Sequence, residues 1–247
     1  MAYLHFPIPQ EINPSKRDEY IFPYGRVRTD QEDLFHYNRR LSREVQILKA
    51  QYFMVEKDML STFDYVYPVV NHLTVYSPKY ASIIKSACNL YEIVSRKLYD
   101  DLFGISDVNI YNYLSLEYLL DLRSIKIESP LLEIEFPAAS TDILNPFAEL
   151  QWNKASLIQN TMIPSWWNAY NDIKHGFNNY ANSATLHNAL RATIAVACLC
   201  YKVYGSGVTL GKILWYDTQN GKKIYYPLEL KMSELLFVND GRMGVSF

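Results

Sequence analysis

The stretch from Ala189 to Tyr201 constrains the fold of this chain more than any other feature, because it is apolar almost all round when drawn as a helix. It is rich in Ala, Cys and Thr, and such small side chains let neighbouring helices approach closely. Its longest strongly apolar run, 192–201, falls well short of the roughly 20 residues that a membrane span needs. We therefore expect a central helix, beginning near Ser183, that other helices surround.

Two longer segments repeat apolar residues at steps of three and four, the spacing of an amphipathic helix. The first begins after Asp33, would span on the order of 40 Å and ends before Pro68; its apolar positions are Leu34, Tyr37, Leu41, Val45, Leu48, Tyr52, Val55 and Met59. The second begins at Ser77, a capping residue followed by proline, and ends at Gly104. Its inward stripe consists of Ile84, Ala87, Tyr91, Val94, Leu98 and Leu102.

Shorter elements complete the predicted bundle. A third helix is expected over 110–122, and a fourth begins near Pro164 and runs to about Phe177. Between them, prolines interrupt every helical pattern, so we assign 125–160 to a small insertion of irregular and β structure. Within it, 132–136 alternates apolar and acidic residues as an exposed strand does.

Both ends of the chain differ from this helical middle. Residues 1–30 carry four prolines among scattered aromatic residues, which predicts an extended arm. At the other end, the segments 208–216 and 222–230 flank Asn220-Gly221, a strong signal for a β-hairpin. The predicted class is therefore mainly α: an up-and-down bundle of about five helices over 31–205, with a C-terminal hairpin extension over 206–247.

Charge and composition exclude several classes of protein. Lys plus Arg number 24 and Asp plus Glu number 26, so no global positive field would draw the chain to nucleic acid or to an anionic membrane. The start of the chain lacks a charged segment followed by an apolar one. We expect a soluble cytoplasmic protein without a membrane association, in which any contact with RNA is local.

Cysteines and histidines lack the spacing of metal sites. Cys88, Cys198 and Cys200 lie in predicted helices and lack the paired spacing of a zinc site or a disulfide framework, which favours reduced core residues. His5, His36, His72 and His187 are too scattered for two ligands to share a helix face. The chain also lacks a glycine-rich phosphate loop and a nucleophile elbow, so neither a metal nor another cofactor is expected.

A polar stripe without formal charge runs along the predicted fourth helix. At about 100° per residue, Trp166, Tyr170, Ile173 and Phe177 gather on the core side, while Asn168, Asn171, His175 and Asn178 gather opposite, bordered by Trp167, Asp172 and Lys174. Two interpretations stay open. In the first, Asn178, Asn179 and Asn182 belong to the turn that follows, and Asn171 and His175 form an exposed pair. In the second, Asn171 orients His175 for acid–base or phosphate-contact work.

The run from Trp166 to His175, followed by the small-residue helix, resembles the signature end of HEPN-like proteins, compact helical bundles that are often dimeric. In active members an Arg, usually followed by a polar residue, precedes a His by four to six residues, and the two cleave RNA without a metal. The resemblance places His175 at the position of that His and Asn171 at that of the polar residue. Tyr170 stands where the Arg is expected, or Ala169 or Asn168 on the longer spacings.

This departure from the pattern affects chemistry, because a metal-independent ribonuclease needs positive charge at the phosphate. Lys174, or an arginine from elsewhere such as Arg191, would have to supply it. On that basis His175 is the candidate general acid or base, Asn171 orients it and Lys174 carries charge. Asn168, Trp167 and Asn178 are the candidate ligand-binding residues.

The resemblance implies a homodimer that brings two copies of this face together over an RNA or nucleotide ligand, with a bacterial defence or toxin-like role. The alternative is a non-catalytic helical module that binds a protein partner. A basic cluster, Arg39, Arg40 and Arg43, is interpreted as a solvated face that would matter only if it met Asn171 across a dimer. Glu92 and Arg96 are spaced for an ion pair within the second helix.

Overall fold

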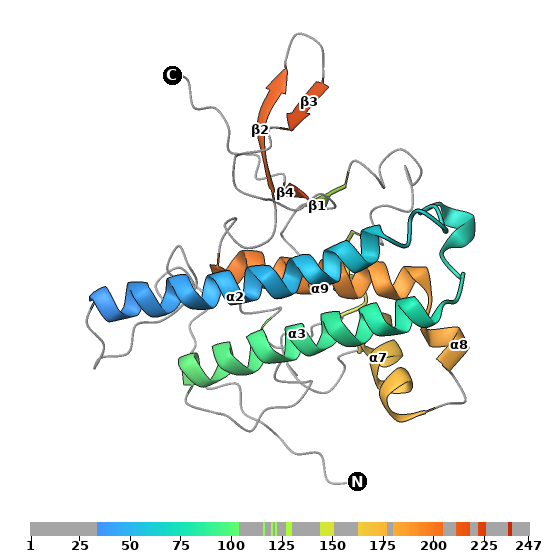
Figure 1. The fold of residues 1–247 in the computed structure, drawn as a ribbon, viewed down its shortest axis with the longest axis horizontal. Helices are drawn as coiled ribbons and strands as arrows, with labels where there is room; N and C mark the ends of the chain where they lie inside the picture. The colour runs from blue at the N-terminus through green and yellow to red at the C-terminus, as the bar shows by residue number, and fades with distance from the viewer. Residues whose placement is uncertain are drawn as a thin grey trace.

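The computed structural model of this chain describes residues 34–103, 116, 120, 122, 127–129, 144–150, 163–176, 180–204, 211–217, 222–225 and 237–238. This part is mainly helical, which confirms the predicted class (Figure 1). Its main helices are α2 (Leu34–Leu60), α3 (Pro78–Phe103), α7 (Ser165–His175) and α9 (Leu186–Tyr204). Short helical turns, η2 (Val70–His72) and α8 (Tyr180–Ser183), lie beside them.

Helix α9 lies at the centre of the bundle, as its apolar sequence predicts. It contacts α2, α3 and α7, and every residue from Ala189 to Cys200 is buried. The side chains of Ala192, Ala195 and Ala197 leave room for these neighbours to pack closely.

The two long helices begin, end and face the core much as predicted. Among the side chains that the structure describes, the buried apolar residues of α2 are Leu48, Tyr52, Val55 and Met59, and those of α3 include Ile84, Ala87, Tyr91, Val94 and Leu98. The other predicted core positions lie outside the described side chains: Leu34, Tyr37, Leu41, Val45 and Leu102. The Ser77 hydroxyl accepts a hydrogen bond from the Lys79 backbone N–H at 3.1 Å, so it caps α3 as expected. The end of α3 at Phe103 agrees with the glycine that follows.

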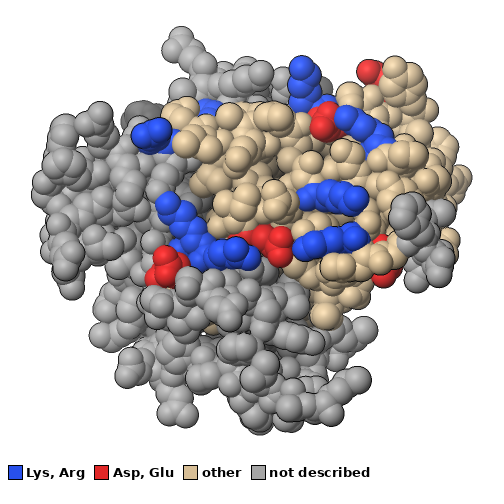
Figure 2. All heavy atoms as spheres, turned by 60° about the horizontal axis from the view of Figure 1, so that its bottom comes forward, with Lys and Arg blue, Asp and Glu red and all other residues tan. Residues whose placement is uncertain are grey.

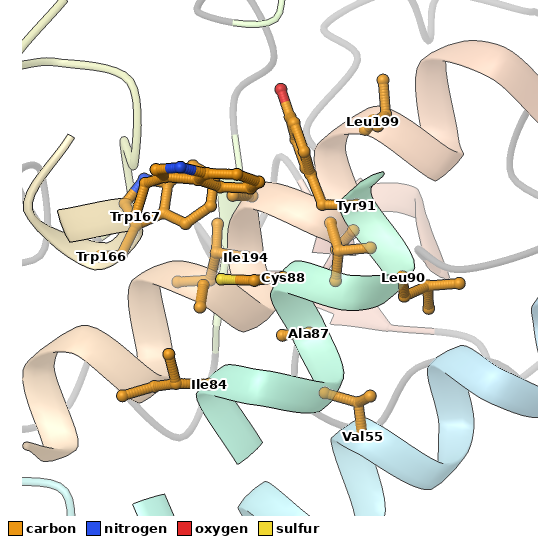
Figure 3. Close-up of a cluster of buried hydrophobic side chains, with 14 of the residues drawn as sticks. Val55, Ile84, Ala87, Cys88, Leu90, Tyr91, Trp166, Trp167, Ile194 and Leu199 are labelled. Carbon is orange, nitrogen blue, oxygen red and sulfur yellow. The ribbon is translucent and has the colours of Figure 1, made fainter. Parts of the chain in front are cut away.

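A cluster of aromatic rings joins α7 to α3. Tyr91 meets Trp166 with ring centroids 5.4 Å apart and Trp167 at 6.1 Å, and the two indoles meet each other at 5.6 Å, all close to edge-to-face. Figure 3 shows these rings above Cys88 and Ile194. Such contacts add to the burial of large apolar surface, so α7 is firmly held on the bundle.

Four short strands form a sheet outside the helical bundle (Figure 1). In the order β1-β4-β2-β3, these are β1 (Ile127–Glu128), β4 (Phe237–Val238), β2 (Gly211–Asp217) and β3 (Lys222–Tyr225). Strand β2 pairs antiparallel with β3, from Asp217 opposite Lys222 onward, and parallel with β4. The register between β2 and β3 shifts between Ile213 and Trp215.

Several predictions fall on residues that the structure does not describe. These are the arm at 1–30, the strand at 132–136, the turn at Asn220-Gly221 and most of the helix at 110–122. From that helix, the described residues Leu116, Leu120 and Leu122 are buried. Among the helices of the described ranges, none is long and apolar enough to cross a membrane.

Helix α7 differs from its prediction at both ends. Pro164 is the cap rather than the first helical residue, and its carbonyl accepts hydrogen bonds from the Trp167 and Asn168 backbone N–H groups at 3.0 Å each. The helix ends at His175 rather than near Phe177, because Gly176 adopts extended backbone; its N–H still donates the last helical hydrogen bond, to Asp172 O at 2.8 Å. His175 is therefore the last helical residue.

Candidate functional site

The polar stripe predicted from the sequence lies on α7, opposite the side that packs on the bundle. Trp166, Ala169, Tyr170 and Ile173 are buried, as the helical wheel requires. On the other side Asn168, Lys174 and His175 are exposed and Asn171 is half-buried. The structure thus leaves four of the six predicted site residues on the outer side of one helix, with Lys174 at the border toward the Tyr170 ring. We call Asn168, Asn171, Lys174 and His175 the α7 face.

The start of α7 is anchored by an ionic network between the buried Arg191 and the part-exposed Glu149. Glu149 accepts hydrogen bonds from the Ser165 backbone N–H at 2.6 Å and from the Ser165 hydroxyl at 2.9 Å. Arg191, 1% exposed on α9, pairs with the same carboxylate and donates to the Ser165 hydroxyl at 3.1 Å. Trp166 Nε1 also donates to the Pro146 carbonyl at 2.8 Å. The segment 144–150 and α9 together fix where α7 begins.

This network changes the acidity of Glu149. Burial raises the pKa of the carboxyl group, but the Arg191 charge and the hydrogen bonds from Ser165 and Arg191 outweigh it, so the net pKa lies below the ordinary value. Glu149 therefore stays ionised, which matches the buried guanidinium beside it. Sequence analysis missed this residue because 144–150 shows no helical or strand periodicity.

The prediction that Arg191 could supply positive charge at the α7 face is wrong. Its guanidinium is buried and engaged with Glu149 and Ser165 at the first turn of α7. His175 stands ten residues further along the helix, about 15 Å away at 1.5 Å per residue. A buried, paired guanidinium at that distance cannot contact a phosphate held at His175.

Tyr170, which stands where the resemblance expects an arginine, is a buried bridge between helices. Its hydroxyl donates to Glu92 Oε2 on α3 at 3.1 Å. Lys174, one turn further on, places its ammonium 5.3 Å from the centre of the Tyr170 ring, within range of a cation–π contact. Glu92, which was predicted to pair with Arg96 within the second helix, thus also binds α7 through Tyr170. The spacing of residues within one helix does not reveal this contact between helices.

The C-terminal end of α7 concentrates the polar groups. Lys174 and His175 lie in its last turn, where the negative end of the helix dipole stabilises cationic side chains. Asn168 Nδ2 donates to the Ile163 carbonyl at 3.2 Å, so part of its hydrogen-bonding capacity is already used near the start of the helix. Asn171, Lys174 and His175 therefore form the end of the α7 face that is best able to meet a ligand.

Two predicted ligand-binding residues do not join this face. Trp167 was expected to border it, but its side chain is 3% exposed and packs against Tyr91, Trp166 and Tyr170. The wheel misplaced it because the aromatic cluster wraps further round α7 than an average apolar stripe. Asn178 lies outside the described residues.

A side-chain contact ties the end of α7 to the turn before α9. The Ser183 hydroxyl donates to Asp172 Oδ2 at 2.7 Å, and Asn188 Nδ2 donates to the Ser183 carbonyl at 2.9 Å. The first of these bonds is accepted by the one carboxylate in α7. A hydrogen bond from a neutral hydroxyl does not cancel the charge of a carboxylate, so the Lys174 ammonium and the Asp172 carboxylate both stand at this end of α7.

Among the described residues, cysteine thiols and possible metal ligands form no second candidate site. All three cysteines are free and buried, as expected; burial raises the pKa of Cys200 to about 12 and also raises the pKa values of Cys88 and Cys198. Thiols in such surroundings are poor nucleophiles. Within the described ranges, no group of three His, Cys, Asp or Glu side chains is arranged to hold a metal ion.

Comparisons with known proteins give no further assignment. The chain matches no protein-family model, no curated protein and no solved structure. The resemblance to HEPN-like proteins therefore stays a prediction that rests on the residues of α7 and α9.

Proposed function

We propose that the chain is a HEPN-like protein that binds RNA or a nucleotide at the α7 face. The observation that carries this proposal is the contrast between the two sides of α7. Its inner side is fixed by Trp166, Tyr170 and the Ser165 network, whereas amide, imidazole and ammonium groups stand at its open end. A rigid helix that presents such groups is well suited to position a ligand.

The chemistry of these side chains suits a phosphate-bearing, hydrogen-bonding ligand. The Asn171 amide both donates and accepts, so it can bind a base edge or a phosphate oxygen. Lys174 and His175 can contact phosphate from the last turn of the helix. Figure 2 shows one face of the molecule with Lys and Arg side chains separated by other residues and by Asp or Glu. Binding would therefore depend on local contacts rather than on a broad basic surface.

In this proposal the bundle of 31–205 dimerises and brings two α7 faces together over the ligand, with the hairpin extension of 206–247 outside the bundle. As general base His175 takes the proton of a ribose 2′-hydroxyl that attacks the adjacent phosphorus, or as general acid it protonates the 5′-oxygen that leaves as the P–O5′ bond breaks and a 2′,3′-cyclic phosphate forms; Asn171 orients it. Because Tyr170 is buried and Arg191 is engaged elsewhere, Lys174 from one or both copies supplies the charge at the phosphate.

The test separates binding from cleavage. A labelled single-stranded RNA is incubated with the protein in excess chelator, and its anisotropy and integrity are followed. We expect His175→Ala to abolish cleavage, and Lys174→Ala to weaken binding by several fold. Lys57→Ala is the matched control, since Lys57 is an exposed lysine in the last turn of α2.

The outcomes decide between three results. Binding with cleavage that needs His175 establishes a metal-independent ribonuclease. Binding that needs Lys174, without cleavage, establishes a binding protein. If the wild-type chain binds no RNA or nucleotide, or if Lys57→Ala weakens binding as much as Lys174→Ala, the proposal is wrong.

A second candidate, a protein-interaction module, is favoured by the outer face of α2. Ile47, Ala50 and Met54 are exposed there, Met54 to 69%, at steps of three and four that align them along the helix. Substituting Met54→Glu should disrupt any assembly through this face without changing the fold, because the side chain projects outward. Sedimentation or light scattering of both chains would show a loss of assembly, and an unchanged assembly would count against this candidate.

A further inference from the structure

The connection between α2 and α3 carries three exposed tyrosines. Tyr65 is 89% exposed, Tyr76 is 43% exposed and Tyr67 is exposed to a similar degree. An aromatic ring interacts only weakly with water, and exposed aromatic rings often mark binding sites. Tyr76 is distinguished from the other two because its surroundings connect it to the α7 face.

Three contacts bring Tyr76 to the end of the bundle where α7 finishes. Its backbone forms a bridge with Thr185, and the Ser77 N–H next to it donates to the Ala184 carbonyl at 3.1 Å. The neighbouring Ser183 hydroxyl bonds to Asp172 on α7 at 2.7 Å. Figure 1 shows α8 between the end of α7 and the start of α3, on the right of the bundle.

The Tyr76 ring is held in place at this end. It meets the half-buried Tyr180 ring of α8 edge to face, with centroids 6.0 Å apart and planes at 76°. In this arrangement one ring supports the other from its edge, and Tyr76 retains exposed surface. A fixed, part-exposed aromatic ring loses little conformational freedom when a flat ligand stacks on it.

We propose that Tyr76, supported by Tyr180, stacks an unpaired base of a single-stranded RNA whose phosphates lie at the α7 face. This inference rests on the proposed function and narrows it to single-stranded RNA, because a base can stack on a protein ring only when it is free of its own helix. It also adds an aromatic contact that the sequence motif around His175 does not contain.

Charge at this end of the bundle favours stacking over electrostatic capture. Lys79 is neutralised by Asp58 at 2.5 Å, Asp172 is bonded to Ser183, and Asp64 is exposed near the tyrosines. Three of these four charged side chains are acidic, so electrostatic attraction of a phosphate is weak there and a base contact must carry much of the affinity. A ligand without bases would keep only the contacts of Lys174 and His175.

The experiment compares two probes of equal length: a single-stranded RNA containing 2-aminopurine, and an abasic strand with the same phosphates. We expect wild type to bind the first about tenfold or more tightly than the second, and to quench 2-aminopurine fluorescence on stacking. Tyr76→Leu should lose this preference and the quenching, while Tyr76→Phe should retain both. Thermal melting of each variant checks that Tyr76→Leu is folded.

Each outcome bears on a different claim. If wild type binds both probes equally, or if Tyr76→Leu binds and quenches as wild type does, the stacking inference is wrong and RNA binding at α7 survives. If wild type binds neither probe, the proposed function fails as well. If Tyr76→Leu is folded and loses only the preference for bases, the stacking contact is established.

Discussion

The environment of Arg191 shows how much one buried side chain depends on its partners. Its guanidinium has almost no contact with solvent, and its charge is stabilised by Glu149, the Ser165 hydroxyl and, at 3.5 Å, the Asn145 carbonyl. Among the described residues, its Nε finds no hydrogen-bond acceptor. The guanidinium is therefore only partly satisfied, and losing the Glu149 carboxylate leaves a buried charge without compensation.

Glu149→Gln tests how strongly Arg191 depends on its carboxylate partner. The substitution keeps the shape of the side chain but removes the charge that compensates Arg191, so it should lower the free energy of unfolding by about 3–5 kcal/mol. Urea unfolding followed by tryptophan fluorescence measures the change. The matched control is Asp58→Asn, which breaks the exposed pair with Lys79 and should cost at most about 1 kcal/mol. Equal losses in the two variants would contradict the structural role of Glu149.

The lowered pKa of Glu149 also predicts a dependence on pH. This pKa is lower in the folded chain than in the unfolded chain, where a glutamate has a pKa of about 4.3. The ionised carboxylate therefore stabilises the fold at pH values above that pKa. The stabilisation is lost as the pH falls from there through the folded pKa. The unfolding free energy of wild type should thus drop more steeply below about pH 4.3 than that of Glu149→Gln. Parallel curves would show that Glu149 has no such role.

At the scale of single elements, the capping of α3 gives a direct prediction. Ser77→Ala removes the acceptor for the Lys79 N–H and should cost about 1 kcal/mol of stability. Ser77→Asn should retain most of it, because an asparagine side chain caps equally well. The control is Ser82→Ala, an exposed serine inside the same helix, where alanine is the better helix former. A loss in Ser82→Ala equal to that in Ser77→Ala would refute the assignment of Ser77 as the cap.

Elements with a clear periodicity were predictable from the sequence, and those defined by distant partners were not. The steps of three and four in α2, and the nearly uniform apolarity of α9, each specify a local structure and its buried side. Glu149 lacks such a signal, because its role depends on Ser165 and Arg191, which are far from it in the sequence. Trp167 was misplaced for the same reason: its neighbours, not its position on the wheel, decide its burial.

The candidate site likewise contains residues that helical spacing predicts and contacts that it does not. Asn168, Asn171 and His175 share one face because helical spacing alone places them there, and the same spacing places Lys174 at its border, about 100° from His175. The bridge from Tyr170 to Glu92 and the neighbourhood of Tyr76 depend on how α3, α7 and α8 pack, which local patterns do not encode. Helical spacing thus predicted which groups α7 offers, and the packing shows what surrounds them.

For the molecule as a whole, charge limits how it can bind RNA. The net charge is −2, so attraction over long distances is weak, and contacts must form where the ligand touches the surface. The α7 face offers one permanent cation, Lys174, in each copy. Each phosphate neutralised in a single strand contributes about −0.7 to the slope of log K against log salt concentration. The few charges available therefore predict a shallow dependence on salt.

We expect a slope between about −0.7 for one α7 face and about −1.4 for two faces in a dimer. Lys174→Gln should make the slope shallower by about 0.7 for each copy that contacts the RNA, whereas Lys57→Gln should leave it unchanged. Anisotropy titrations from low to moderate salt measure this. A slope of about −4 or steeper would mean that several phosphates meet a basic surface away from α7, since Lys174 alone cannot release that many counterions. The slope thus reports whether the RNA lies where the geometry of α7 places it.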